Sequence, residues 1–176
     1  GVRFVFPHAP VMPVTLNMGM AMRAWYDIRD LDPKTRHDEA GICRAQAEVE
    51  RLIALEHERG IASHRIVLAG FSQGGAIAMY TALRHRERLA GLIALSAYLV
   101  LGDTLEATAS AANREIPILQ VHGLHDPMVP HDRGVSSCER LRALGYAVEF
   151  KSYPMQHEVC APEIRDIAQF LARVLA

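Results

Sequence analysis

The chain has 176 residues, of which 50% are hydrophobic and 22% are charged, and its formal net charge is −1. This length suits one domain with a substantial core. The balanced charge argues against a nucleic-acid partner, because such proteins carry a surplus of basic residues that neutralises phosphates. The longest apolar run, residues 92–101, is interrupted by Ser96. It is also shorter than the roughly 20 residues of a transmembrane helix, so stable membrane insertion is not expected.

The three cysteines, Cys43, Cys138 and Cys160, are widely spaced. An odd, scattered set predicts neither a disulfide framework nor a zinc site of the CxxC type. Reduced thiols are typical of a cytoplasmic protein, and no secretory signal is visible. The first residue is glycine rather than methionine, which leaves open that an upstream segment was removed.

Short apolar runs alternate with helical patterns along the whole chain. In chain order we expect a strand over 3–7, a long loop over 11–34, a helix over 38–59, a strand over 66–69, a helix over 74–85, a strand over 91–96, a short helix over 104–113, a strand over 118–122, a helix over 133–144, a strand over 148–153 and a helix over 162–175. This alternation predicts an α/β fold, in which helices cover both faces of a mostly parallel sheet. No linker or repeat divides residues 1–176, so a single domain is expected.

The segment Gly70-Phe71-Ser72-Gln73-Gly74 fits the pattern G-x-S-x-G between a predicted strand and a predicted helix. In such a turn the serine adopts a strained backbone, and the flanking glycines avoid steric clashes. Ser72 is therefore a candidate nucleophile. The Gln73 backbone N–H begins the helix and is a candidate oxyanion donor. The alternative is an ordinary glycine-rich turn.

A serine nucleophile needs a base, and the base needs an orienting acid. Asp126 and His157 each follow a predicted strand, in the order serine, acid, histidine that α/β-hydrolases use. All three side chains should emerge at the carboxyl edge of the sheet, where ligands bind in such folds. The sequence thus predicts a triad of Ser72, His157 and Asp126.

Other residues compete for these roles. Asp132 and Asp103 are alternative acids, and His122 with His125 could suggest a metal site. A glycine turn between the two histidines makes the metal site the weaker interpretation. We interpret His122 instead as a polar end to its strand.

Several motifs together resemble the carboxylesterase and acyl-protein thioesterase (phospholipase/carboxylesterase) family of serine hydrolases, over nearly the whole chain. They are Phe6-Pro7-His8-Ala9-Pro10, Ala24-Trp25-Tyr26-Asp27, Ala69-Gly70-Phe71-Ser72-Gln73-Gly74-Gly75, His122-Gly123 with Asp126 and Val129-Pro130, and Tyr153-Pro154-Met155 with His157. The resemblance implies a cytosolic α/β-hydrolase without a cofactor. It gives the triad and Gln73 the same roles as above, and it implies that Trp25, Met128 and Val129 border an acyl pocket. Core packing of Trp25 and loop packing of Met128 and Val129 are the alternatives.

The chain departs from the family pattern in two places. The family's His-Gly-x-Gly loop, which supplies a second oxyanion donor, would precede Gly1. We therefore expect a sheet that lacks one or more N-terminal strands, in a chain that lacks a few tens of residues of the functional protein. Gln156 stands where relatives usually place glycine.

The expected function is hydrolysis of short to medium acyl esters through an acyl-enzyme intermediate on Ser72. An acyl-protein thioesterase or a lysophospholipase would use the same machinery with a different pocket. A catalytically silent binding protein of the same fold, or an inactive fragment, is the alternative from another class. A small acyl ester is the expected partner, and a homodimer is left open.

Overall fold

The computed structural model describes residues 1–30 and 37–176, so residues 31–34 of the predicted loop lie outside the described range. Contacts within the chain divide it into two compact units, Gly1–Ala45 and Gln46–Ala176. Helix α1, Glu39–Glu58, crosses this boundary and matches the helix predicted over 38–59. The single-domain organisation stays a prediction.

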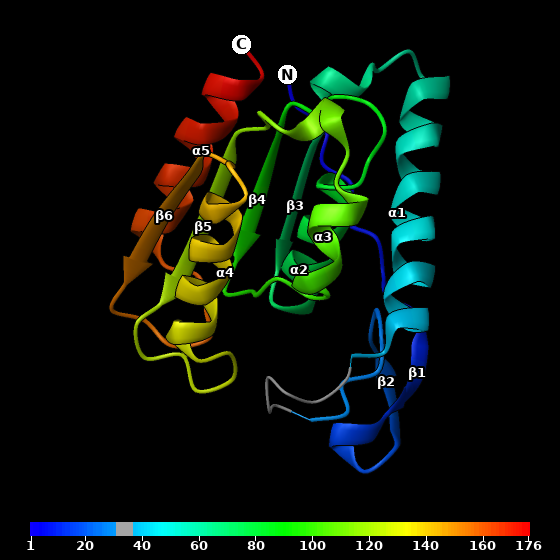
Figure 1. The fold of residues 1–176 in the computed structure, drawn as a ribbon, viewed down its shortest axis with the longest axis vertical. Coiled ribbons are helices and arrows are strands. Elements are labelled where there is room, and N and C mark those ends of the chain that lie inside the picture. Colours follow the sequence, from blue (N-terminus) through cyan, green and yellow to red (C-terminus); the bar gives the residue numbers. More distant parts are fainter. Residues whose placement is uncertain (31–36) are drawn as a thin grey trace. The chain divides into compact units, whose positions relative to one another are not determined.

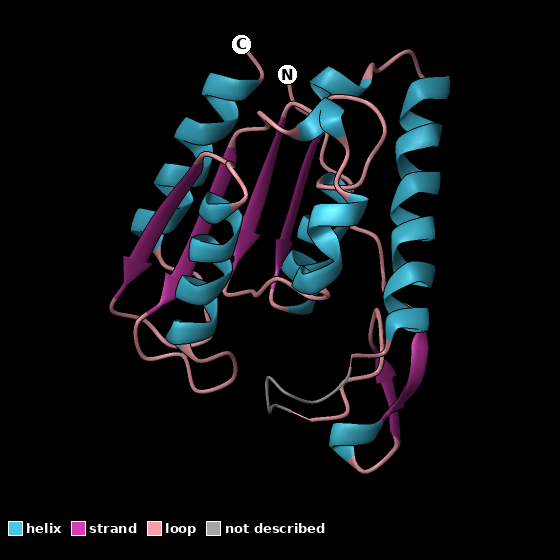
Figure 2. Cartoon of the chain, viewed as in Figure 1, coloured by secondary structure: helices cyan, strands magenta, loops and turns pink. Residues whose placement is uncertain are grey.

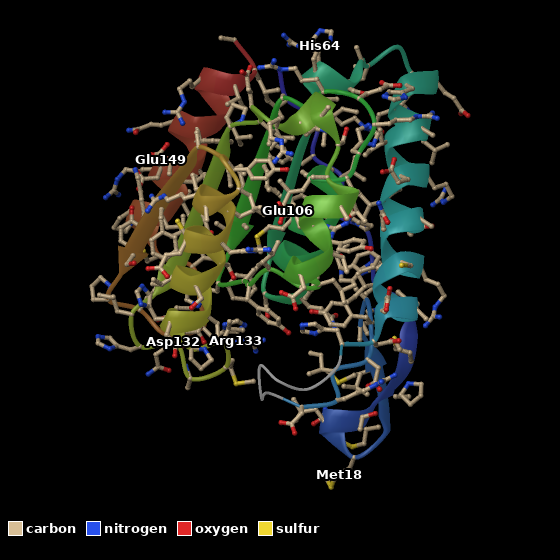
Figure 3. All side chains as sticks on the ribbon, viewed as in Figure 1. Met18, His64, Glu106, Asp132, Arg133 and Glu149 are labelled. Carbon is tan, nitrogen blue, oxygen red and sulfur yellow. The ribbon has the colours of Figure 1, made fainter. Side chains whose placement is uncertain are left out.

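In the N-terminal unit, strands β1 (Val11–Val14) and β2 (Met20–Arg23) form an antiparallel hairpin around a 3-10 turn. This hairpin replaces the irregular loop predicted from residue 11 onward. Its turn contains Met18 and Gly19 with φ of 55° and 74°, and Met18 projects from the tip (Figure 3). The positive φ values let the chain reverse within a few residues.

The strand predicted over residues 3–7 is wrong, because these residues form no regular element. Phe4 and Phe6 are exposed to 64% and 84%, and their rings stack on each other at 6.1 Å. A strand needs a neighbouring strand to pair its backbone groups, and among the described residues the paired strands are β1 with β2 and β3 to β6, none of which pairs with residues 3–7.

The larger unit is built on a parallel four-stranded sheet in the order β3-β4-β5-β6 (Figure 2). Its strands are β3 (Val67–Phe71), β4 (Gly91–Leu95), β5 (Ile118–Gly123) and β6 (Val148–Tyr153). Residues of β4 and β5 are almost entirely buried, as expected for central parallel strands. Among the described residues, β3 pairs with a strand on one side only.

Helices cover both faces of this sheet (Figure 1). One face packs Leu92, Ala94 and Ile118 against α2 (Gln73–Ala82), α3 (Gly102–Thr108) and α4 (His131–Ala143). The other packs Ile93 and Leu119 against α5, Ala161–Val174. The alternation of Leu92 and Ile93 between faces follows the two-residue period of a strand. The predicted α/β class is confirmed.

Within the described ranges, no helix is both long enough and apolar enough to cross a membrane.

Candidate active site

Ser72 lies on a tight turn between β3 and α2. Its backbone has φ 54° and ψ −123°, a conformation that side-chain-bearing residues rarely adopt. A Cβ on Gly70 would lie 2.2 Å from the backbone of Gly74, so only glycine permits this close crossing of strand and helix. The turn has the strained geometry that the sequence pattern predicts for a nucleophile.

The neighbouring strand holds this turn in place. The Ser72 N–H donates to the Leu95 carbonyl over 2.8 Å, which ties the turn to the end of β4. A Cβ on Gly75 would lie 2.7 Å from the Ala97 side chain, so α2 packs tightly on the segment after β4. Gln73 is the first residue of α2, and its backbone N–H lies at the positively polarised end of that helix.

Asp126 lies in the loop after β5, and its carboxylate is held on both oxygens. Oδ1 accepts hydrogen bonds from the backbone N–H groups of Met128, at 2.9 Å, and Val129, at 2.8 Å. Oδ2 lies 2.7 Å from Nδ1 of His157. Burial raises the pKa of the Asp126 carboxyl, but the His157 bond and the two backbone donors outweigh it. The net result is a pKa below the usual range, so Asp126 is ionised at neutral pH.

His157 lies in the loop after β6 and is partly exposed. Because an ionised carboxylate can only accept, Nδ1 of His157 carries the proton, and Nε2 is left to accept one. The ring also packs against Phe71, the residue before Ser72, with 4.6 Å between ring centroids. This contact brings the loop of His157 next to the turn of Ser72.

Backbone contacts join the Asp126 loop to the His157 loop. Leu124 N–H donates to the Tyr153 carbonyl over 2.8 Å, and His125 N–H donates to the Met155 carbonyl over 3.1 Å. A Cβ on Gly123 would lie 2.3 Å from the Gln156 carbonyl oxygen, so the His157 loop crosses directly over the end of β5. The two loops therefore form one surface.

Comparison with known proteins identifies the family of the chain. The family model of phospholipase/carboxylesterase matches residues 1–175. The chain belongs to this family.

Two curated relatives of the chain are fungal acyl-protein thioesterases. Acyl-protein thioesterase 1 of Gibberella zeae is 40% identical over 99% of this chain and 77% of its own length. Acyl-protein thioesterase 1 of Neurospora crassa is 41% identical over 99% and 74%.

Solved structures agree on the fold. The crystal structure of SOBER1 from Arabidopsis thaliana has a TM-score of 0.92 at 29% identity, covering 98% of this chain and 83% of that one. Acyl-protein thioesterase 2 of Zea mays has a TM-score of 0.88 at 30% identity, covering 97% and 80%. The chain has the α/β-hydrolase fold and is a hydrolase of that class.

The two alternative acids, Asp132 and Asp103, lie in helices rather than in the loop of Asp126. Asp132 is exposed in the first turn of α4, where Figure 3 labels it beside Arg133. Asp103 is exposed in the first turn of α3. In the described ranges, no group of three or more His, Cys, Asp or Glu side chains is placed to hold a metal ion.

The residues predicted to border an acyl pocket differ in their surroundings. Met128 is 53% exposed, whereas Val129 is 7% exposed and contributes its backbone to the Asp126 turn. Trp25 is partly buried in the N-terminal unit. Their role in binding an acyl chain stays a prediction.

Phe71 and His122 lie near the candidate residues Asp126 and His157, and the sequence predicts a catalytic role for neither of them. In the sequence Phe71 is only a variable position of G-x-S-x-G, whereas in the structure its contact with His157 joins segments far apart in the chain. His122 was interpreted as a polar strand end, but it is fully buried and bonds the Val129 carbonyl. The one sequence feature that could have drawn attention to His122 is the motif His122-Gly123.

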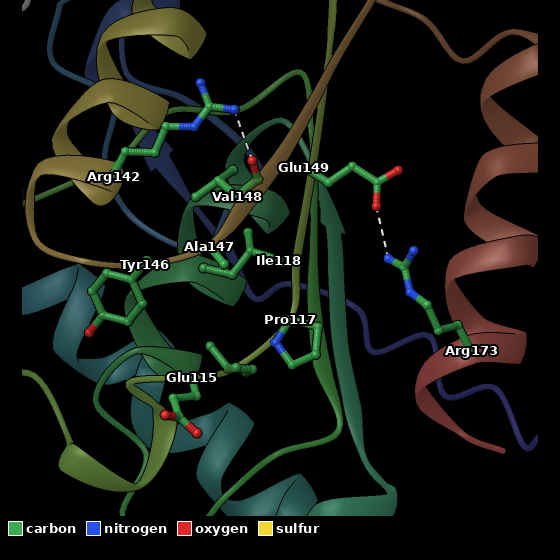
Figure 4. Close-up of a pocket in the computed structure, with 10 residues that line it drawn as sticks. Glu115, Pro117, Ile118, Arg142, Tyr146, Ala147, Val148, Glu149 and Arg173 are labelled. Carbon is green, nitrogen blue, oxygen red and sulfur yellow. Dashed lines mark hydrogen bonds and ion pairs between the residues drawn. The ribbon is translucent and has the colours of Figure 1, made fainter.

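A cavity of about 610 Å³ lies away from these loops (Figure 4). It is lined by residues that begin β5 and β6, including Ile118 and Val148. Arg142 and Arg173 at its rim already donate to the Val148 carbonyl and to Glu149. This cavity is at the opposite ends of the strands from Asp126 and His157, and it is not part of the candidate site.

Proposed function

We propose that the chain is a serine hydrolase that cleaves acyl thioesters and esters, with Ser72 as nucleophile, His157 as general base and acid, and Asp126 as its orienting carboxylate. The observation that carries the proposal is the 2.7 Å contact between Asp126 Oδ2 and His157 Nδ1, beside the strained turn of Ser72. In the neutral imidazole this contact places the proton on Nδ1, so that Nε2 can accept one, as a base requires.

The reaction proceeds in two halves. His157 Nε2 takes the proton of the Ser72 hydroxyl while Oγ attacks the acyl carbonyl carbon. The negative oxygen that forms is stabilised by the Gln73 backbone N–H at the start of α2. The bond from carbon to sulfur or oxygen then breaks, and the leaving thiol or alcohol takes the proton from His157. Water repeats these steps on the acyl-enzyme and releases the carboxylic acid.

Among substrates we favour the thioester of an S-acylated protein over a simple carboxylic ester. Two of the curated relatives that align with 99% of this chain are acyl-protein thioesterases. The geometry of Ser72, His157 and Asp126 serves either leaving group, so the choice depends on the acyl pocket. Trp25, Met128 and Val129 are the proposed lining.

Intact mass after treatment with a fluorophosphonate tests the proposed nucleophile. We expect one covalent adduct on the wild-type protein and none on Ser72→Ala. Ser96→Ala is the matched control, because Ser96 also directly follows a strand and has a positive φ of 46° but is fully buried. A folded wild-type protein without an adduct would support a silent binding protein instead.

Substrate class is tested by comparing kcat/KM for an S-palmitoylated peptide, a lysophospholipid and a short-chain nitrophenyl ester. We expect the peptide thioester to be preferred. A preference for the nitrophenyl ester would favour the carboxylic esterase that the sequence alone suggests.

A further inference from the structure

His122 is a buried polar residue at the end of β5 that the proposed reaction does not use. Its side chain has no exposed surface. Burial lowers the pKa of its imidazole, and the bond to Val129 and the charge of Asp126 only partly oppose this. His122 is therefore neutral at physiological pH.

The tautomer of His122 follows from its neighbours. Nε2 lies 2.8 Å from the Val129 carbonyl oxygen, which can only accept, so Nε2 carries the proton. Nδ1 has no hydrogen-bond partner in the part of the chain that the structure describes. It abuts α4 at Gly134, where a Cβ would lie 2.3 Å from it. The ring is thus held between a loop carbonyl and the backbone of a helix.

Val129 connects this ring to the proposed catalytic carboxylate. Its carbonyl accepts from His122, and its N–H donates to Oδ1 of Asp126 over 2.8 Å. The same Nε2 lies 3.6 Å from Oδ2 of Asp126, the oxygen that bonds His157. A continuous chain of contacts therefore runs from the rigid end of β5 to the proposed base.

The other titratable groups that act on His122 are Asp126, His131 and His157. His131 of α4 packs edge-on against its ring at 5.8 Å between centroids and bonds Ser152 of β6. On the same face of β5, Gln120 donates to the Gly134 carbonyl over 2.9 Å. These contacts hold the start of α4 against β5. They therefore fix the end of the Asp126 loop that leads into α4.

We propose that His122 is a positioning residue for Asp126: through Val129 it anchors the carboxylate to the end of β5, at the place where Oδ2 meets His157. The inference rests on the proposed roles of Asp126 and His157. If the Asp126 carboxylate were displaced, it would stabilise the imidazolium of His157 less well in the transition state. A displacement of about 1 Å costs up to about 100-fold in rate.

Two amide variants separate this role from mere packing. In His122→Gln the amide nitrogen can reach the position of Nε2, whereas in His122→Asn it can reach only the position of Nδ1. Both are neutral and polar. We expect His122→Asn to lose about 10- to 100-fold in kcat/KM with little change in KM. The acid limb of the kcat/KM profile of His122→Asn should move to lower pH. The kcat/KM of His122→Gln should stay within a few fold of the wild-type value.

A second readout does not need turnover. Proton NMR of the folded protein should show a far-downfield signal from His157 Nδ1–H against Asp126, which Asp126→Asn removes. We expect the signal to be weakened or shifted in His122→Asn and retained in His122→Gln. If wild-type protein shows this signal but forms no fluorophosphonate adduct, the proposed function fails while the positioning role is still tested.

Gly134→Ala is the second variant, in case His122→Asn does not fold. Its methyl group must displace the His122 ring, while alanine favours the helix at that position. We expect the same change in the NMR signal. Folded His122→Asn or Gly134→Ala protein with wild-type signal and pH profile would overturn the proposal, even if its melting temperature were lower.

Discussion

Phe71 packs its ring against the imidazole of His157, with 4.6 Å between centroids and 47° between planes. The residue before the proposed nucleophile therefore contacts the proposed base directly. Asp126 fixes the Nδ1 edge of the imidazole, and Phe71 covers part of its face. Together these two contacts restrict where Nε2 can point.

Phe71→Ala should lower kcat/KM more than it lowers stability. An aromatic contact of this kind is worth about 1 kcal/mol, which corresponds to roughly five-fold in rate. Phe71 is already 36% exposed, so its removal leaves no closed cavity. Phe71→Leu, which keeps an apolar contact, is the control and should retain most activity. Equal losses in kcat/KM and in unfolding free energy would show that Phe71 only packs.

The backbone strain at Ser72 should be measurable as a difference in unfolding free energy between Ser72 variants. A residue with a Cβ at φ 54° and ψ −123° costs about 1–3 kcal/mol, whereas glycine adopts such values freely. Glycine also loses about 0.5–1 kcal/mol more entropy on folding. We therefore expect Ser72→Gly to be more stable than Ser72→Ala by about 1 kcal/mol in urea unfolding. An alanine variant of equal or higher stability would mean that the turn relaxes.

Asp126→Asn should alter both activity and acid stability. Without the negative charge, kcat should fall by about 10⁴-fold, because the imidazolium loses its partner and the tautomer is no longer fixed. The pKa of Asp126 in the folded protein is held below its ordinary value of 3.8. Its contribution to stability is therefore present above that value and is lost as pH falls through the native pKa.

The measurement for Asp126 is the unfolding free energy against pH. Wild type should lose stability more steeply than Asp126→Asn as pH falls below about 5. Parallel curves would show that the carboxylate is not held as described.

The sequence predicted the parallel sheet well because buried strands are short apolar runs bounded by turns. The strand expected over 148–153 has the observed bounds of β6, and the helix expected over 38–59 is α1 within one residue at each end. The hairpin of β1 and β2 was missed, since Val11 to Arg23 shows no clear alternation. Its turn depends on Met18 at φ 55°, which residue type alone does not indicate.

The sequence predicts that Ser72, Asp126 and His157 emerge at one edge of the sheet, because each follows a strand and parallel strands end at the same edge. What could not be predicted are contacts through the fold. His122 reaches a backbone carbonyl of the loop, which has no sequence signature, and Phe71 meets a residue after β6. Such contacts depend on how loops close over the strands.

Gly123→Ala should disturb the proposed base without touching it. The new methyl group would lie 2.3 Å from the Gln156 carbonyl oxygen and 2.5 Å from that of Met155. Both atoms belong to the backbone, so the His157 loop must move. We expect kcat/KM to fall by up to about 100-fold, with a smaller change in KM. Wild-type kinetics in folded Gly123→Ala would show that this loop accommodates the methyl group without displacing His157.

Gln156→Gly, on the other side of that contact, should leave activity unchanged or raise it. Gln156 is exposed, and its φ is not positive, so this backbone position does not require glycine. Its N–H makes one long bond of 3.3 Å to Glu158, and its carbonyl faces Gly123 whichever side chain is present. Glycine adds freedom to the unfolded chain, so stability should fall by about 0.5–1 kcal/mol. Paired kcat/KM and urea measurements check both expectations, and a severe loss of activity would show that the Gln156 side chain helps to aim His157.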